Sequence, residues 1–158
     1  MNQNENKYNR FALCREMLET GRVIRQIPKL TIDAAANFLI KKKKLLVTGE
    51  GSSRLIPAKN LIYDNLLMGA PLPIITEGAT QAMEYKLDDM AVFGISNSGK
   101  TKEVIRLFES LETKQHESRV GITANNNTPL EKKATNLIVQ NCGPENAVAA
   151  TKSVVEQA

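Results

Sequence analysis

The stretch that decides the fold is residues 92–101, which read Val-Phe-Gly-Ile-Ser-Asn-Ser-Gly-Lys-Thr. The apolar run Ala91–Ile95 predicts a short buried strand, and the spacing of apolar residues in Lys102–Lys114 predicts a helix. Hydroxyl and amide side chains and one glycine lie between them. Such a turn offers hydroxyls and backbone N–H groups, and the start of a helix adds a favourable dipole for an anion. The sequence therefore predicts a phosphate-binding turn here.

Two other interpretations of this turn stay open. The segment Gly94–Thr101 fits the nucleotide-binding P-loop pattern G-x-x-x-x-G-K-T, in which the lysine contacts phosphates and the threonine holds magnesium. Against it, Gly94 lies inside the apolar run, and the later strands Arg119–Ala124 and Leu137–Gln140 end without an aspartate for the metal. The simplest alternative is an ordinary helix-capping turn with Ser98 as the N-cap.

The length and composition of the chain limit the class of protein to which it can belong. A chain of 158 residues fits one domain, and it contains neither an apolar run long enough to span a membrane nor a signal peptide. Cys14 and Cys142 lack metal or redox spacing, which favours reduced thiols in the cytoplasm. The net charge of +4 is mild and aromatic residues are few. We interpret the basic run Lys41–Lys44 as the solvated end of a helix, so we expect neither nucleic-acid nor membrane binding.

Strands and helices alternate along the chain, which predicts an α/β fold: a parallel sheet covered by helices on both faces, a three-layer α-β-α sandwich. A polar, flexible tail is expected at residues 1–7, followed by a single domain over residues 8–158. The expected helices are Tyr8–Ile27, Thr31–Lys43, Arg54–Met68, Glu77–Lys86, Lys102–Lys114, Pro129–Ala134 and Asn146–Gln157, and the five expected strands are Lys44–Thr48, Leu72–Thr76, Met90–Ser96, Arg119–Ala124 and Asn136–Gln140.

Ligands of parallel sheets bind beyond the carboxyl ends of the strands. This rule places Gly49–Ser53, Glu77 and Ser96–Thr101 on one rim, with Asn125 near it. No cluster of metal ligands accompanies these residues, so a small phosphorylated metabolite fits better than a nucleoside triphosphate, which brings magnesium. The hydroxyls expected on this rim, together with one amide, are Ser52, Ser53, Ser96, Ser98, Thr101 and Asn97.

Three segments in this order resemble the sugar isomerase (SIS) domain: the Gly-x-Gly-Ser-Ser turn, the Ser-Asn-Ser-Gly-x-Thr turn, and residues 143–152, Gly-Pro-Glu-Asn-Ala-Val-Ala-Ala-Thr-Lys. The chain is most similar to the first of the paired domains in glucosamine-6-phosphate synthase, fructosamine-6-phosphate deglycase and tagatose-6-phosphate isomerase-type proteins. The resemblance implies a five-stranded parallel sheet and a bound hexose or amino-hexose phosphate. It implies that Ser96, Asn97, Ser98 and Thr101 bind the phosphate, that Ser52 and Ser53 contact the sugar or phosphate, and that Val148 touches the sugar through its backbone.

The implied reaction is aldose–ketose isomerisation, or deamination or deglycation of an amino-sugar phosphate, by proton transfer without metal or cofactor. Glu77 is the first candidate base and Glu145 the second. The single histidine, His116, precedes the fourth strand, so we expect it at the other end of the sheet and exposed to solvent. Lys100 stands where family members usually carry glutamate, and we expect it to point to solvent. For Lys152 we expect an ion pair with Glu145.

The resemblance leaves two rival functions, a non-catalytic phosphosugar sensor or regulatory subunit and, from the motif above, a P-loop nucleotide-binding protein. It also implies a homodimer or higher homo-oligomer in which one chain supplies part of the other's pocket. Relatives with paired domains continue into further helices and a second SIS domain, which the resemblance leaves open here.

Overall fold

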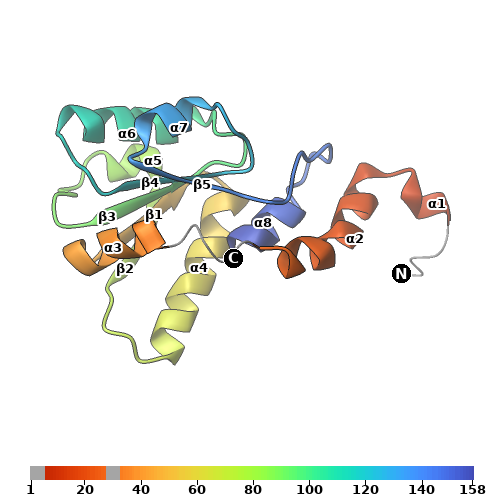
Figure 1. Ribbon diagram of the computed structural model, residues 1–158, viewed down its shortest axis with the longest axis horizontal. Helices are drawn as coiled ribbons and strands as arrows, with labels where there is room; N and C mark the ends of the chain where they lie inside the picture. The colour runs from red at the N-terminus through yellow and green to blue at the C-terminus, as the bar shows by residue number, and fades with distance from the viewer. Residues whose placement is uncertain (1–5, 28–32) are drawn as a thin grey trace.

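The computed structural model describes residues 6–27 and 33–158. All five strands are parallel and form one sheet in the order β2-β1-β3-β4-β5 (Figure 1). This confirms the predicted five-stranded parallel sheet. The strands are β1 (Leu45–Gly49), β2 (Ile74–Gly78), β3 (Ala91–Ile95), β4 (Arg119–Thr123) and β5 (Asn136–Val139).

The middle of the sheet is buried on both faces. Every residue of β1 is buried, and β3 is buried except for Phe93, which is intermediate. A strand covered on both faces needs apolar side chains pointing both ways, which explains why these segments are continuous apolar runs rather than alternating ones.

Two clusters of core residues lie on opposite faces of the sheet, and they make the three-layer sandwich that the sequence predicts. One cluster joins the sheet to α5 (Ala79–Ala82), α6 (Lys102–Thr113) and α7 (Pro129–Lys133). The other joins it to α3 (Asp33–Lys42) and α4 (Ser52–Leu67). Figure 1 shows α6 and α7 above the sheet and α3 and α4 below it.

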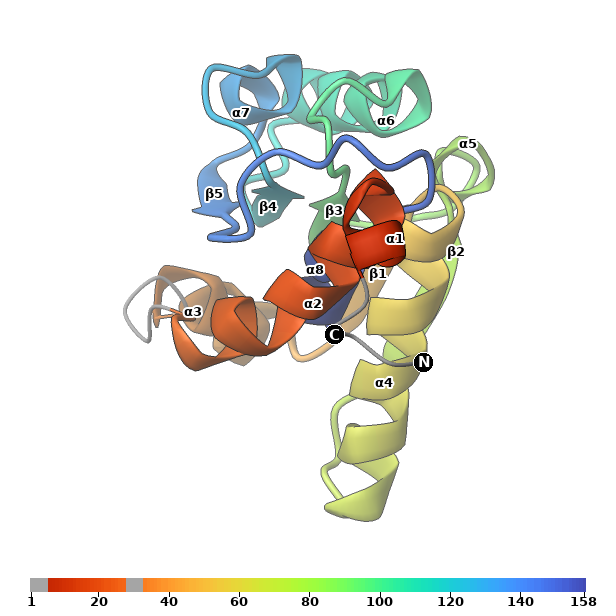
Figure 2. The same ribbon diagram turned by 90° about the vertical axis from the view of Figure 1, so that its right-hand side faces the viewer.

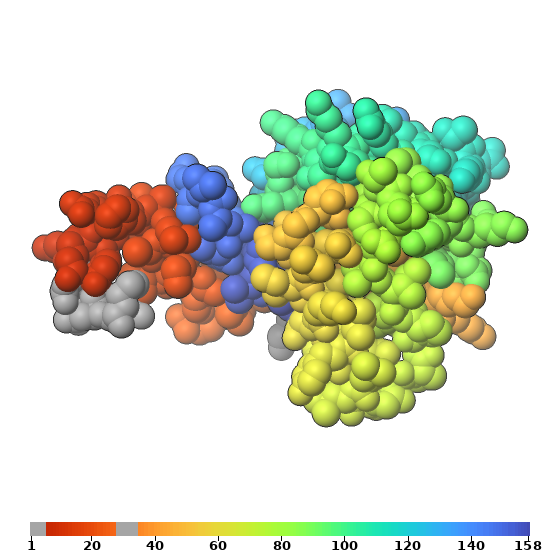
Figure 3. Space-filling view, turned by 180° about the vertical axis from the view of Figure 1, so that it is seen from behind, coloured from red at the N-terminus to blue at the C-terminus, as the bar shows by residue number. Residues whose placement is uncertain are grey.

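The N-terminal helices stand apart from this sandwich. Residues predicted as one helix, Tyr8–Ile27, form α1 (Asn6–Asn9) and α2 (Ala12–Arg25). Helix α2 packs against α8 (Lys152–Gln157), beside the sheet rather than on it (Figures 1 and 2). Figure 3 shows the same arrangement from behind, with the N-terminal helices reaching past α8 at one end of the molecule.

Two predicted helices are shorter in the structure. The helix expected over Glu77–Lys86 is the single turn α5, and Glu77 belongs to β2. The helix expected over Asn146–Gln157 begins only at Lys152, so residues 143–151 form a loop. The proposed cap of the second helix, Thr31, lies outside the described residues.

Among residues 6–27 and 33–158, no helix combines the length and the apolar character that crossing a membrane requires.

Gly94 sets how closely α6 approaches β3. A Cβ atom at this position would lie 2.4 Å from Phe108 Cε2 and 2.6 Å from Phe108 Cζ. Phe108 is fully buried, so its ring has little room to move. We expect Gly94→Ala to lower the free energy of unfolding by about 1–3 kcal/mol, measured by urea denaturation.

Two comparisons test this cause. The same substitution in a Phe108→Leu background should cost clearly less, because leucine lacks the two ring atoms. Gly21→Ala, on the exposed face of α2, should stabilise by about 0.5–1 kcal/mol. Equal costs of Gly94→Ala in both backgrounds would contradict the packing role.

Candidate functional site

The turn between β3 and α6 is held together by its own hydroxyls. Ser96 is buried, and its Oγ lies 2.7 Å from Thr101 Oγ1 and accepts a hydrogen bond from the Thr101 N–H at 3.3 Å. The Gly99 N–H donates to the Ser96 carbonyl at 2.9 Å. Gly99 has a φ of +64°, and a Cβ there would lie 2.5 Å from the Thr128 side chain. Only glycine fits this position, because both the backbone angle and the space demand it.

The N-terminus of α6 faces this turn without a side-chain cap. Thr101 occupies the N-cap position and its side chain accepts no capping hydrogen bond. Ser98 is exposed and accepts from the Lys100 N–H instead, so the alternative interpretation, with Ser98 as the N-cap, does not hold. The first N–H groups of a helix have no intrahelical acceptor, and the helix dipole adds positive potential there. This end of α6 can therefore bind an anion such as a phosphate group.

The structure explains why the P-loop pattern occurs here by chance. Gly94, the first glycine of the pattern, lies in the middle of β3 and serves the packing of Phe108. A P-loop would need it in the loop that follows the strand. Lys100 is exposed, as the sequence predicts.

A second segment, the loop of residues 143–151, comes to the same edge of the sheet. Asn97 Nδ2 donates a hydrogen bond of 2.9 Å to Glu145 Oε2 across 48 residues of sequence. The Asn97 carbonyl accepts from the Ala124 N–H at 3.0 Å, the Thr123 hydroxyl at 3.1 Å and Asn125 Nδ2 at 2.9 Å. Asn97 thus ties the turn to the ends of both β4 and this loop.

Between these segments lies a hollow of about 180 Å³ beside the start of α6. It contains Asn97 and Ser98 from the predicted phosphate turn, Asn125 from the end of β4, and Glu145. Its complete lining is Asn97, Ser98, Ala124, Asn125, Gly143, Pro144 and Glu145.

Glu145 accepts hydrogen bonds from several donors at once. Besides Asn97, Thr151 donates to it from its N–H and its hydroxyl, both at 2.9 Å, and Ser153 donates from its N–H at 3.2 Å and from its hydroxyl. Partial burial works to raise the pKa of the Glu145 carboxyl, but the hydrogen bonds from Ser153 and Thr151 outweigh it and lower the pKa. A carboxylate held ionised and fully engaged is suited to holding the loop in place rather than to taking up a proton.

Helix α2 holds the other side of the loop. Glu16 is buried and accepts from the backbone N–H of Asn146 and, at 3.2 Å, of Ala147. Lys152 is 5% exposed and forms an ion pair of 2.7 Å with Glu19. The hydrogen bond from Lys152 lowers the pKa of the Glu19 carboxyl. The expected pairing of Lys152 with Glu145 was wrong, because α2 packs here and its Glu19 takes the lysine, a contact that no local sequence pattern indicates.

The remaining predicted site residues lie at the carboxyl edge of the sheet but outside the hollow. Ser52 and Ser53 begin α4, the first exposed and the second half-buried. Val148 lies on the loop with its side chain fully exposed. Neither the serines nor Val148 line the hollow described above. Their roles stay predictions.

Glu77 lies near the carboxyl end of β2, two strands from β3 with β1 between them. Its Oε1 accepts the N–H of the next residue, Gly78, at 2.9 Å, and the Tyr85 hydroxyl lies 3.5 Å from its Oε2. Sequence reasoning missed a second carboxylate at this edge, Glu50, whose Oε1 accepts the Ala79 N–H at 3.1 Å. The signal was present, since Glu50 sits between two glycines in the turn that follows β1.

His116 is at the amino end of β4, as predicted, but it is buried rather than exposed. Its Nε2 lies 2.9 Å from the Leu87 carbonyl. This histidine therefore cannot serve a ligand at the carboxyl edge of the sheet.

The SIS domain family model matches residues 38–158. The chain therefore belongs to the SIS domain family, as the sequence resemblance predicted. None of the curated proteins matches this chain.

Solved structures of similar fold include proteins of several kinds. The C-terminal domain of glucosamine-fructose-6-phosphate aminotransferase from Francisella tularensis has a TM-score of 0.76 and 18% identity, covering 97% of this chain and 46% of that one. A Bacteroides fragilis NCTC 9343 protein is described as a candidate phosphosugar isomerase involved in capsule formation. It has a TM-score of 0.73 and 19% identity, and the match covers 92% of this chain and 82% of that one. The Vibrio vulnificus NanR protein complexed with ManNAc-6P has a TM-score of 0.69 and 16% identity, and the match covers 98% of this chain and 58% of that one.

The hydrogen bonds of Glu145 predict a pH-dependent stability. A carboxyl whose pKa is lowered by folding stabilises the protein above its ordinary pKa, and this contribution disappears as the pH falls through the lowered value. We expect Glu145→Gln to lower the free energy of unfolding at pH 7 by about 1–3 kcal/mol. The amide NH₂ of glutamine is a hydrogen-bond donor, and it would face the donors whose hydrogen bonds the carboxylate accepts.

Urea denaturation at pH 7 and near pH 3 measures this effect. The difference in the free energy of unfolding between variant and parent should be smaller at the acidic pH. Glu117→Gln is the matched control, since Glu117 is exposed and its carboxylate accepts no hydrogen bond from a described residue. A difference for Glu145→Gln that stays constant between the two pH values would refute the role of its charge.

Proposed function

We propose that this chain binds a phosphorylated sugar at the carboxyl edge of its sheet, with the phosphate at the turn Ser96–Thr101. The observation that carries the proposal is the convergence of the uncapped N-terminus of α6 with the hydroxyls of Ser96, Ser98 and Thr101. Backbone N–H groups and hydroxyls bind a phosphate monoester without a metal ion. Among the described residues no cluster of three metal-binding side chains exists.

The hollow next to this turn is the place for the sugar. Asn97, Asn125 and the loop of residues 143–151 surround it with amide and backbone groups, which suit sugar hydroxyls. In this arrangement the Val148 backbone and the serines of the first turn, Ser52 and Ser53, approach the sugar from the outer side. The NanR structure, which has the same fold and contains ManNAc-6P, supports a phosphosugar as the ligand class.

We further propose that the chain isomerises a sugar phosphate by metal-free proton transfer between its C1 and C2 atoms. Glu77 is the candidate base, because its carboxylate lies at this edge and its neighbours leave it accessible. Glu145 is less suited, since its oxygens already accept hydrogen bonds from three residues. The candidate isomerase from Bacteroides fragilis supports this reaction class.

One observation favours the second candidate function, a phosphosugar sensor without catalysis. The only histidine is buried at the opposite end of the sheet, so no imidazole is available to open the sugar ring. A single chain thus offers a phosphate site and a sugar-sized hollow but an incomplete set of acid and base groups.

We also propose that a second copy of the chain completes the site. An apolar cleft of about 440 Å³ lies between α2, α4 and α8, beside the loop of residues 143–151. Exposed apolar side chains line it, among them Met17 of α2 and Ile56 of α4. Exposed apolar surface of this kind is typical of an interface between protein chains.

Removing two hydroxyls from the turn tests the binding site. The double variant Ser96→Ala/Ser98→Ala should bind fructose-6-phosphate or glucosamine-6-phosphate at least about 100-fold more weakly, because each hydrogen bond to a charged group contributes about 1.5–3 kcal/mol. Binding is measured by thermal-shift titration and calorimetry, since a ligand of the folded state raises the melting temperature.

Thr113→Ala, at the far end of α6, is the control and should leave binding unchanged. Unphosphorylated fructose should bind weakly to every variant. Undiminished affinity of the double variant would rule out this turn as the phosphate site, and a thermal shift with magnesium-ATP alone would favour a nucleotide site instead.

Glu77→Gln tests the candidate base separately from binding. An amide cannot accept a proton from C2, so interconversion of the sugar phosphate should fall by at least about 100-fold while the affinity changes little. Turnover is followed by proton exchange with deuterated water in NMR. Glu84→Gln, an exposed carboxylate on the same segment, should retain the parent rate; if Glu77→Gln retains it too, Glu77 is not the base.

A further inference from the structure

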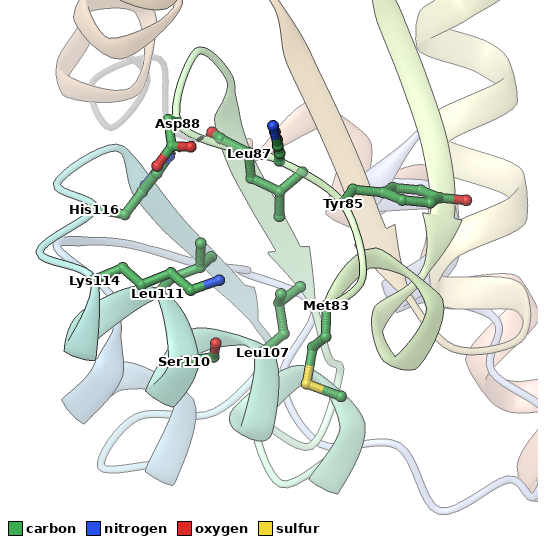
Figure 4. A pocket seen from close by; sticks show the side chains of 10 residues that line it. Met83, Tyr85, Leu87, Asp88, Leu107, Ser110, Leu111, Lys114 and His116 are labelled. Atoms are coloured by element: carbon green, nitrogen blue, oxygen red, sulfur yellow. Dashed lines mark hydrogen bonds between the residues drawn. The ribbon is translucent and has the colours of Figure 1, made fainter.

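A second hollow lies at the amino edge of the sheet, on the opposite side from the phosphate turn. It has a volume of about 150 Å³ and lies between α6 and the segment that leads from α5 into β3 (Figure 4). Apolar side chains of Met83, Leu87, Leu107 and Leu111 line it. A cavity of this volume can hold a molecule about as large as benzene.

Lysines stand at the mouth of this hollow. Lys86 and Lys114 both line it and are both exposed. Figure 4 shows the Lys114 side chain reaching from the end of α6 toward Leu107. Neither ammonium group forms a hydrogen bond or ion pair with any residue that the structure describes. The hollow therefore combines an apolar floor with two cations that have no partner in the described chain.

A larger and more polar hollow, of about 530 Å³, adjoins it and shares Asp88, Lys114 and His116 with it. Lys41 and Lys42 from the end of α3 line this second hollow, and Lys42 donates to the Asp88 carbonyl at 2.5 Å. Four lysines thus face two carboxylates across the joined hollows, those of Asp88 and Glu117. The excess of positive charge favours an anionic ligand.

His116 lines both hollows, and one of its ring nitrogens has no partner among the described residues. The residue is 6% exposed, and its Nε2 must donate to the Leu87 carbonyl, because a carbonyl can only accept. Its Nδ1 is buried and has no hydrogen-bond partner among the described residues. Buried polar atoms without partners are rare in folded proteins and are found at sites that bind ligands or water.

We propose that the amino edge of the sheet is a second ligand site, for a small amphipathic anion: an apolar body of about benzene size with one carboxylate. The body occupies the space between α6 and Leu87, and the carboxylate pairs with Lys86 and Lys114. The site is independent of the proposed phosphosugar site, since the two lie at opposite ends of the parallel strands and share no residue.

The test is a titration of the uniformly ¹⁵N-labelled chain with benzoate, followed in ¹H–¹⁵N correlation spectra. Saturable shifts are expected at the amides of Leu87, Leu107, Leu111 and His116, with a dissociation constant of about 0.1–10 mM for a ligand of this size. Lys114→Met should weaken binding about tenfold. Lys132→Met, which removes an exposed lysine of α7 that lines neither hollow, should change nothing.

Three further probes make the ligand class falsifiable. Benzyl alcohol, which keeps the ring and lacks the charge, should bind at least tenfold more weakly, and so should inorganic phosphate, which lacks the apolar body. Ser110→Phe, which fills the hollow from α6, should abolish the shifts while the rest of the spectrum is retained.

The proposal is overturned if benzoate causes no saturable shift, if its shifts fall only at Ser98 and Gly99, or if benzyl alcohol or phosphate binds as well as benzoate. Because none of these probes is a sugar phosphate, the outcome is separate from that of the phosphosugar titration.

Discussion

The candidate site depends on one carboxylate, Glu145, which connects segments that are far apart in sequence. On one side it accepts from Asn97 in the turn after β3, and on the other from the residues that begin α8, Thr151 and Ser153. Without this connection the loop of residues 143–151 would have no polar contact with the turn among the hydrogen bonds described. A hydrogen-bonded carboxylate is a strong link when it stays ionised, and its donors keep it so.

The same constraint shapes the chemistry that the site can perform. A general base must exchange a proton with the substrate, so its lone pairs must be free in at least one state. The oxygens of Glu145 are engaged, whereas Glu77 and Glu50 each accept one backbone N–H at the edge of β1 and β2. Both carboxylates accept N–H groups at the start of α5, those of Gly78 and Ala79.

Much of the fold could be predicted because the buried strands have a simple pattern. Burial alone predicts the parallel sheet. It requires the continuous apolar runs seen in β1 and β3, and it explains the apolar stripe of α6 that covers them. The turn between β3 and α6 was also predictable as a structure, since Gly99 and the serines around it have few structural alternatives.

The errors arose where tertiary contacts override local pattern. Residues 146–151 have a composition that allows a helix, but Glu16 and Glu145 accept hydrogen bonds from their backbone N–H groups, so the chain stays a loop until Lys152. His116 lies in a polar stretch that indicates exposure, yet the Leu87 carbonyl and the end of α6 cover it. Leu87 lies 29 residues from His116, and Glu16 lies 130 residues from Asn146, so no local pattern could identify these two contacts.

Helix α2 therefore belongs to the site although it lies outside the sandwich. Glu16 and Glu19 hold the loop at Asn146 and Lys152, while the outer face of α2 exposes large apolar side chains. The buried Lys152 makes this attachment costly to break, because an unpaired buried cation is strongly destabilising. Any contact that moves α2 must move the loop with it, and the loop carries Glu145 to Asn97. The geometry of the turn Ser96–Thr101 is thus linked to the surface that α2 presents to its surroundings, through three glutamates and one lysine: Glu16, Glu19, Glu145 and Lys152.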